Sequence, residues 1–289
     1  MRRAALISLT AVLAAGCGSA RPVATTTATP TPKAAPAGLR VGVVGPLAID
    51  VRGARVERGP LDEVGDAPLV LVSARSASVE KVTAAAEATP GSHFAYVGGS
   101  AKAAKQPNLV GLVLRDDQAA KLGGVVAGFV AREQGGTAAR VAWVGPEERA
   151  LSDAFALGVH ESLPPATILY AFSKRIPARC KEAALGAIAR GAVVVMAHGG
   201  ACASAAADGA HQQNHVALSL GDFELPSVAA TVVVRDAVSG VFHGGEDLVF
   251  GAASGAIGVR RLDPLVSPAT AAAARASAEQ LGSALRGTG

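Results

Sequence analysis

Four side chains between positions 198 and 215 have the spacing of metal ligands. His198 and Cys202 are four residues apart, and so are His211 and His215. Imidazole and thiolate groups at such intervals on helices or loops can hold zinc. No acid-rich loop or further histidine cluster accompanies them, and Cys202 has another candidate partner. We therefore interpret the three histidines as polar residues at helix ends, and we expect no metal and no other cofactor.

The other candidate partner of Cys202 is Cys180. If Cys17 is modified, these two remain as an even pair in an exported domain, where disulfides persist. Each begins a predicted helix, over 178–190 and over 201–211, on either side of one predicted strand. Helices that follow parallel strands start at the same edge of the sheet. We expect a disulfide, with two buried thiols as the alternative.

Ligand-binding groups are expected where predicted strands end. Asp222 follows the predicted strand 216–220, and open α/β sheets bind ligands beyond the carboxyl ends of their strands. Gly99 and Ser100 follow another strand, where glycine allows close approach of the backbone to a ligand. A simple tight turn is the equally good alternative for these two residues.

Other polar and aromatic residues have structural interpretations. Asp116 and Asp117 lie at the start of the predicted helix 117–133, so we expect them to cap it. Trp143 and Tyr96 lie within predicted strands, so we expect both in the core rather than on a stacking surface.

Several classes of function are disfavoured by motif and composition. The chain has no GxSxG, GxxxxGK[ST], GxGxxG or HExxH motif, and no nucleophile has an evident paired base. We therefore expect a protein that is not an enzyme. Half of the 289 residues are hydrophobic, 17% are charged and 3% are aromatic, with a formal net charge of +4. This balance argues against disorder and against a nucleic-acid partner.

The folded part alternates between short apolar runs and longer amphipathic ones. The runs are almost continuously apolar, as is typical of parallel strands buried on both faces. The alternation over 93–220 predicts βαβ crossovers and an α/β fold with parallel sheets flanked by helices. Ser267 followed by Pro268 predicts the start of the last helix. The predicted strands are 40–44, 69–73, 93–97, 109–114, 140–144, 167–171, 192–197 and 216–220. The predicted helices are 77–88, 117–133, 147–161, 178–190, 201–211, 228–241 and 268–285.

The alternation is interrupted between the first two predicted strands. Four breaks at Gly53, Gly59, Pro60 and Gly65 leave no stretch of helical length there. A parallel crossover normally contains a helix. We expect loops and a short strand over 54–57 instead.

The N-terminus carries an export signal. Met-Arg-Arg is followed by about a dozen apolar residues and by Leu-Ala-Ala-Gly-Cys, which ends at Cys17 and resembles a bacterial lipobox. We expect 1–17 to be a lipoprotein signal peptide and Cys17 to receive the lipid. The domain would then be anchored at the extracytoplasmic face of the cell membrane. An ordinary signal or an uncleaved anchor is the alternative.

The segment 18–38 consists mainly of Pro, Thr and Ala and has almost no large apolar side chain. Such a segment cannot offset the entropy of ordering, so it predicts an extended tether. No later segment is apolar for long enough to predict a membrane span.

The order of several segments resembles one family. PNLVGLVLRDDQAAKLGGVVAGFVA, RVAWVG with a following F-x-x-G, CKEAALGAIARGAVVVMAHGGAC and VRDAVSGVFHGGEDLVFGAASGAIGV are similar to segments of the basic-membrane-protein (BMP) type solute-binding lipoproteins of ABC transporters. The similarity covers roughly 93–262, and it lies in the order and spacing of the segments.

The resemblance implies a two-lobed fold of the type I periplasmic-binding-protein kind, with a shortened first lobe. The first lobe would comprise 39–114 and about 227–262, and the second 115–226 and about 263–289. The lobes would close over a small ligand, a nucleoside in characterised members, and deliver it to an ABC permease. By resemblance Asp222 is the best polar ligand contact, and the weaker candidates are Asp50, Gly99, Ser100 and Gly199.

The expected ligand site departs from the family pattern. The loop 46–51 has neither the Phe nor the Asn of the family, and Gly98 replaces an expected Asp. Val228, Ala229 and Ala230 stand where a Lys is expected. Three hypotheses follow: an importer component that binds a small polar solute, a diverged envelope lipoprotein with a sensing or structural role, and, least favoured, an exported hydrolase.

Overall fold

The computed structural model describes residues 38–287. The expected signal peptide, the lipidation site Cys17 and all of the expected tether except Gly38 lie outside the described residues. Within 38–287, no helix combines the length and the apolar character that crossing a bilayer requires.

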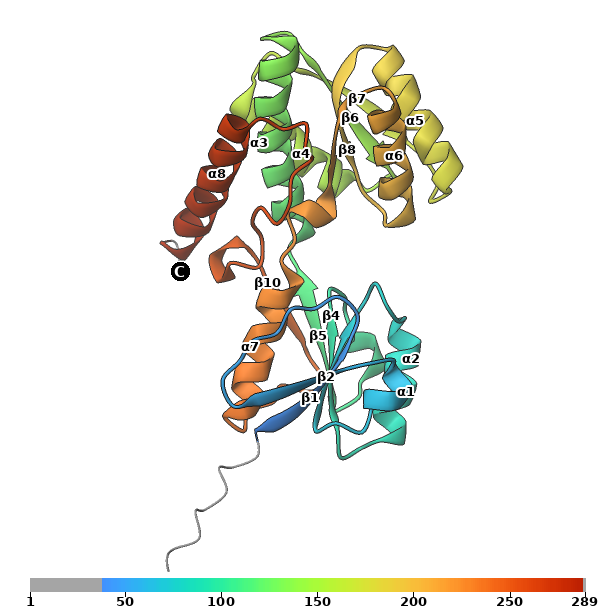
Figure 1. Cartoon of the computed structure of the whole chain (residues 1–289), viewed down its shortest axis with the longest axis vertical. Helices are drawn as coiled ribbons and strands as arrows, with labels where there is room; N and C mark the ends of the chain where they lie inside the picture. The colour runs from blue at the N-terminus through green and yellow to red at the C-terminus, as the bar shows by residue number, and fades with distance from the viewer. Residues whose placement is uncertain (1–37, 288–289) are drawn as a thin grey trace, which may run out of the picture. The chain divides into compact units, whose positions relative to one another are not determined.

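The first sheet contains six parallel strands in the order β10-β5-β4-β3-β1-β2. Figure 1 shows it in one lobe, with its helices around it. Its middle strands are mostly apolar, and β3 is buried at every residue. The elements of this lobe are β1 Leu39–Val44, β2 Ala54–Arg58, α1 Leu61–Val64, β3 Leu69–Ser73, α2 Val79–Ala88, β4 His93–Val97, the 3-10 turn η1 Lys102–Ala104, β5 Leu109–Leu114, α7 Pro226–Val238 and β10 Asp247–Phe250.

The interrupted region forms the edge of this sheet. The expected short strand is confirmed as β2, which pairs in parallel with β1 through a connection, 45–53, that contains no helix. The region also forms the four-residue helix α1, which the breaks had argued against. Pro60 stands at its N-cap and Gly65 at its C-cap, so the same residues that shorten the helix also delimit it.

Two elements of the first lobe come from late in the chain. The helix α7 contacts β1, β3, β4 and β5, and β10 pairs with β5. The short run that forms β10 was not among the predicted strands. It pairs because β5 would otherwise leave its outer edge open.

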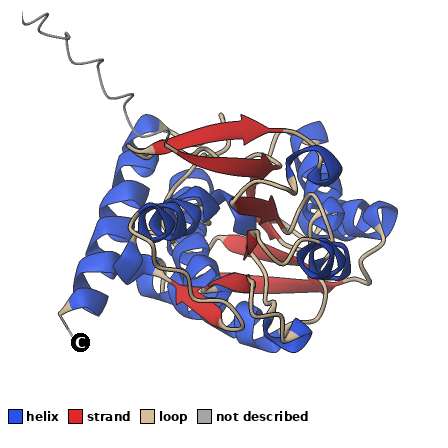
Figure 2. Ribbon diagram, turned by 90° about the horizontal axis from the view of Figure 1, so that it is seen from below, coloured by secondary structure: helices blue, strands red, loops and turns tan. Residues whose placement is uncertain are grey.

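The second sheet contains four parallel strands in the order β7-β6-β8-β9. Its strands and helices agree with the predicted alternation within about two residues at each end. Seen from below, with the first lobe toward the viewer, helices lie on either side of the strands of the molecule (Figure 2). The elements are α3 Asp116–Gly135, β6 Arg140–Gly145, α4 Arg149–Ser162, β7 Thr167–Phe172, α5 Pro177–Ala189, β8 Ala192–Ala197, α6 Ala201–Gln212, β9 Val216–Ser219 and α8 Pro268–Arg286. The 3-10 turns η2 Leu220–Asp222 and η3 Ala252–Ser254 lie in the segments that connect the lobes.

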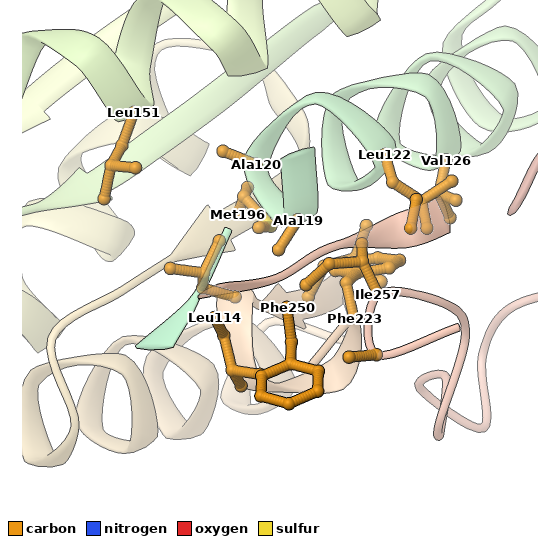
Figure 3. Close-up of a cluster of buried hydrophobic side chains, with 14 of the residues drawn as sticks. Leu114, Ala119, Ala120, Leu122, Val126, Leu151, Met196, Phe223, Phe250 and Ile257 are labelled. Carbon is orange, nitrogen blue, oxygen red and sulfur yellow. The ribbon is translucent and has the colours of Figure 1, made fainter. Parts of the chain in front are cut away.

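Three clusters of buried side chains hold these layers together. One cluster runs through both lobes, where α3 packs over Leu114, Phe223, Phe250 and Ile257 (Figure 3). The other two cover the outer face of each sheet: α1 and α2 on the first, α5 and α6 on the second. Trp143 is fully buried and Tyr96 is 8% exposed, so both belong to the core as expected.

Two local predictions about helix starts have different outcomes. The hydroxyl of Ser267 accepts a hydrogen bond from the backbone N–H of Thr270 and caps α8, as expected. The capping role expected for Asp116 and Asp117 is wrong. Arg115 occupies the N-cap of α3, which has no side-chain cap, and the two aspartates lie in the first turn. Asp117 instead binds the Arg115 guanidinium at 2.7 Å.

Candidate functional site

The chain passes between the lobes where strands of both sheets end. The segment after β9 and the segment after β10 lie side by side as a short antiparallel ladder. The N–H groups of Leu225, Gly258 and Arg260 donate to the carbonyls of Ala256, Phe223 and Asp222 over 2.8 to 2.9 Å. Side chains on these segments are therefore held at the point where both lobes meet.

Arg75 and Glu224 form an ion pair at this place. Arg75 follows β3 of the first lobe, and its Nη2 lies 3.2 Å from Oε2 of Glu224 on the ladder. Only 15% of the Glu224 side chain is exposed. This burial raises the pKa of Glu224, and the positive charge of Arg75 opposes the rise. A Cβ at Gly221 would lie 2.5 Å from the Arg75 guanidinium, so the absence of a side chain there admits it.

Asp116 brings a further carboxylate to the same place. It lies in the first turn of α3, two residues after β5 ends. Partial desolvation, and then the negative charges of Glu224, Glu148 and Asp117, raise its pKa to about 6. The side chain keeps contact with solvent. The site therefore places several carboxylates close enough to one another for their negative charges to interact.

A third group of polar residues follows the strands of the second sheet. Glu148, after β6, binds Arg175, after β7, at 2.9 Å. His198 follows β8 and packs against Trp143, with ring centroids 4.8 Å apart. Burial lowers the pKa of His198, which favours the neutral form of its ring. Its Nε2–H donates to the carbonyl of Pro146 at 3.0 Å.

The residues expected to bind a ligand have varied surroundings. Asp222 lies in η2, where its Oδ2 accepts hydrogen bonds from the N–H of Ser219 at 2.7 Å and from the Ser219 hydroxyl at 2.9 Å. Asp50 is exposed. Gly99 and Ser100 follow β4, and the Ser100 hydroxyl donates to Asp247.

Gly199 follows β8 with a positive φ of +95°, in which glycine is favoured. It lies beside the disulfide of the second lobe. The structure contains the expected bond between Cys180 and Cys202, which joins the first turns of α5 and α6. This bond therefore holds two helix starts next to the strand end that carries Gly199.

The four residues with metal-like spacing all have other partners. Cys202 is in the disulfide, and His198 binds Pro146. Nε2 of His211 lies 2.6 Å from the buried carboxylate of Asp263, and Nδ1 of His215 lies 3.3 Å from the carbonyl oxygen of Val193. No group of three or more His, Cys, Asp or Glu side chains within 38–287 could hold a metal ion.

Four residues that the structure brings to the strand ends were not selected from the sequence: Arg75, Asp116, Glu148 and Glu224. A signal for three of them was present, because each follows a strand by two or three residues, as Asp222 does. Asp116 was assigned to a cap instead. Glu224 has no such signal, since it becomes part of the site only through the ladder.

Two cavities lie against α8 rather than at the strand ends. One, of about 550 Å³, lies between α8 and the segment around Ile257 and Gly258. The other, of about 180 Å³, lies between α8, α3 and α4. The charged groups described above line neither of them.

Comparison with protein-family models and with curated proteins finds no match. Solved structures do match. An ABC transporter solute-binding protein from Conexibacter woesei is 17% identical, with a TM-score of 0.55 over 86% of this chain and 97% of that one. A second such protein, from Aeropyrum pernix, is 15% identical, with a TM-score of 0.52 over 84% and 86%. A transcriptional activator of the comK gene from Bacillus halodurans is 13% identical, with a TM-score of 0.55 over 83% and 96%.

At these identities the likeness concerns the fold. It agrees with two parallel sheets, each flanked by helices. The chain is similar in fold to two solute-binding proteins of ABC transporters and to a transcriptional activator. It has the α/β fold of type I periplasmic binding proteins.

Proposed function

We propose that this chain is the extracytoplasmic solute-binding lipoprotein of an ABC importer and that it binds a small polar solute where the lobes meet. The observation that carries the proposal is the cluster of Arg75, Glu224 and Asp116. Its members come from the ends of β3, β9 and β5, on a fold shared with solute-binding proteins. Ligands of open α/β sheets bind at such strand ends.

The chemistry of the cluster suits the binding of a polar solute. Two carboxylates accept hydrogen bonds from hydroxyl or amino groups, and a guanidinium donates them. A bound solute would displace Arg75 from Glu224 or insert beside the pair. Nucleosides, sugars and amino acids all carry groups of this kind.

The N-terminus and the partner complete the proposal. The lipobox-like segment that ends at Cys17 would anchor the protein to the outer face of the membrane, and the Pro-rich segment would tether the domain to that anchor. The partner would be an ABC permease, which reads the arrangement of the lobes when solute is bound.

The test is a thermal-shift titration of residues 38–289, which form one compact unit. The probes are nucleosides, nucleobases, sugars and amino acids. A ligand at a hundredfold excess over Kd stabilises the folded state by about 2.7 kcal/mol, which raises Tm by a few degrees.

A variant identifies the site. Glu224→Ala should weaken binding by about tenfold or more, because a charge-assisted hydrogen bond is lost. Glu57→Ala is the matched control, since Glu57 also pairs with arginine but lies on the edge strand β2. A protein that melts cooperatively and shifts with none of the probes would contradict the importer proposal.

One observation favours a second candidate, a diverged envelope lipoprotein with a sensing or structural role. Two of the expected ligand contacts, Asp222 and Ser100, are already engaged in hydrogen bonds within the protein. The absence of a shift in the titration would favour this candidate. Permease and ATPase genes next to the gene for this chain would favour the importer.

A further inference from the structure

One ion pair of the described residues connects the two lobes. Arg75 follows β3 of the first sheet, and Glu224 lies on the segment that leaves the second sheet after β9. The two residues are 149 positions apart in the sequence. Each of the other ion pairs within 38–287 joins side chains of a single lobe. The pair of Arg75 and Glu224 is therefore the one ion pair in this part of the chain that depends on how the lobes are placed.

The Arg75 side chain also reaches the end of the second sheet. Gly221 lies in η2, directly after β9. A Cβ at Gly221 would stand 2.5 Å from Nη2 of Arg75 and 3.3 Å from its Cζ, so a side chain at this position would take the space of the guanidinium. The backbone of Gly221 has no positive φ, so it is this close approach, and not the backbone conformation, that favours glycine here.

The backbone is held at both ends of the pair. The N–H of Arg75 donates to the Ser73 hydroxyl at the end of β3, over 3.3 Å. Glu224 forms an antiparallel bridge with Ile257 on the ladder. Because neither backbone can readily follow the other, a movement of the first lobe away from the end of β9 would separate the two charges.

Separation would be unfavourable for Glu224. Its side chain is 15% exposed, whereas that of Arg75 is 53% exposed. A mostly buried carboxylate that loses its guanidinium still bears the cost of burial. The negative charge of Asp222 acts on Glu224 as well, and Arg260 is a second guanidinium whose charge reaches it. Arg260 would therefore offset only part of the loss.

We propose that the pair of Arg75 and Glu224 is a latch that holds the two lobes together before any solute binds. Two-lobed proteins open by rotation about the segments that connect the lobes. The latch opposes this rotation, because it ties the first lobe to the end of the second sheet where Gly221 leaves room for the guanidinium. As a control on the entry of solute it rests on the proposed function, whereas the latch itself can be tested without solute.

The test measures the distance between the lobes in residues 38–289 without any solute. Spin labels are placed on Ala103→Cys in η1 and Ala150→Cys in α4, which are exposed positions that follow strands of different sheets. Double electron–electron resonance then gives the distribution of distances between the labels. We expect one main distance while the latch is intact. Arg75→Gln should raise the ratio of longer to shorter distances by about fivefold or more.

Gly221→Ala tests the latch without removing a charge. Its methyl group would displace the guanidinium from Glu224, so the longer distances should increase here too. Arg40→Gln is the matched control, since it removes a guanidinium that lies 3.1 Å from Asp66 within the first lobe. The control should leave the distribution unchanged. Thermal melts confirm that each labelled variant folds.

The proposal requires both variants to shift the distribution, so the failure of either one overturns it. A shift of equal size in Arg40→Gln also overturns it, because the effect would then not be specific to the pair between the lobes. So does a distribution that is already dominated by longer distances when the pair is intact. A failed solute titration leaves each of these outcomes unaffected, so the latch and the importer proposal fail separately.

Discussion

The outer faces of the two sheets are covered in different ways. Under α5 and α6, nine of the thirteen buried residues are alanine, and a disulfide joins the two helices. Under α1 and α2, three of eleven are alanine, and the cluster includes Phe94, Tyr96 and Leu109 without a disulfide among its residues. Alanine buries much less apolar area than these side chains.

The difference shows how a layer of small side chains, the one under α5 and α6, is stabilised. Small side chains let α5 and α6 approach the sheet closely, but each contributes little hydrophobic free energy. A crosslink instead limits the unfolded chain. We infer that the second lobe depends on its disulfide for stability that the first lobe obtains from large side chains.

The largest effect is expected for Phe94→Ala. Phe94 is fully buried on β4, so its loss leaves a cavity and costs about 4 kcal/mol of unfolding free energy. Urea unfolding of residues 38–289 measures it. The corresponding truncation in the other layer is Ala184→Gly in α5, with an expected cost of about 1 kcal/mol. Equal losses of unfolding free energy in the two variants would contradict the expected difference between the two layers.

Removal of the disulfide comes next. Cys180 and Cys202 are 22 residues apart, so the chain-entropy model gives a loss of about 3 kcal/mol for the Cys180→Ala/Cys202→Ala variant. Reduction of the unaltered protein should give a similar loss. Amide exchange should accelerate in α5 and α6 and stay unchanged in α2. A loss below about 1 kcal/mol would show that the alanine layer is sufficient alone.

Enlarging a buried alanine tests how closely α6 approaches the sheet. Ala206 is fully buried, so Ala206→Leu should cost about 2 kcal/mol through overpacking. Ser204→Leu, at an exposed position of the same helix, should change the unfolding free energy little. A neutral or stabilising Ala206→Leu would mean that the layer has free space.

The smallest effect is expected where the two lobes meet, at Asp116. Its pKa is about 6 in the folded protein and is raised from 3.8, so the folded state binds this proton more tightly. The stability that protonation contributes is therefore present at low pH and is lost as the pH rises through 6.

Asp116→Asn removes the carboxyl group whose ionisation lowers the stability of the folded protein above pH 6. Because the side chain keeps contact with solvent and its charge is screened, we expect Tm to rise by about 2 °C at pH 8 and to change little at pH 4. Melting curves at both pH values measure this. A rise of the same size at pH 4 would contradict an electrostatic cause. Asp117→Asn, which loses the pair with Arg115, should instead lower Tm.

Much of the fold could be predicted because its signals are local. Continuous apolar runs predicted the strands of the second sheet, and two cysteines at the starts of neighbouring helices predicted their bond. The hydroxyl of Ser267 predicted the start of α8, since a cap needs only its own first turn. In each case the residues that interact belong to one element or to consecutive elements.

What the tertiary structure alone decided involves contacts between distant residues. The strand β10 exists because β5 offers an open edge, and the short helix α1 between β2 and β3 contacts β1. Arg75 and Glu224 are 149 residues apart, and no local pattern links them. Asp116 could be read as a cap from its position. Its raised pKa depends on carboxylates that the folded chain brings close, and charge interactions at that range have no signature in sequence.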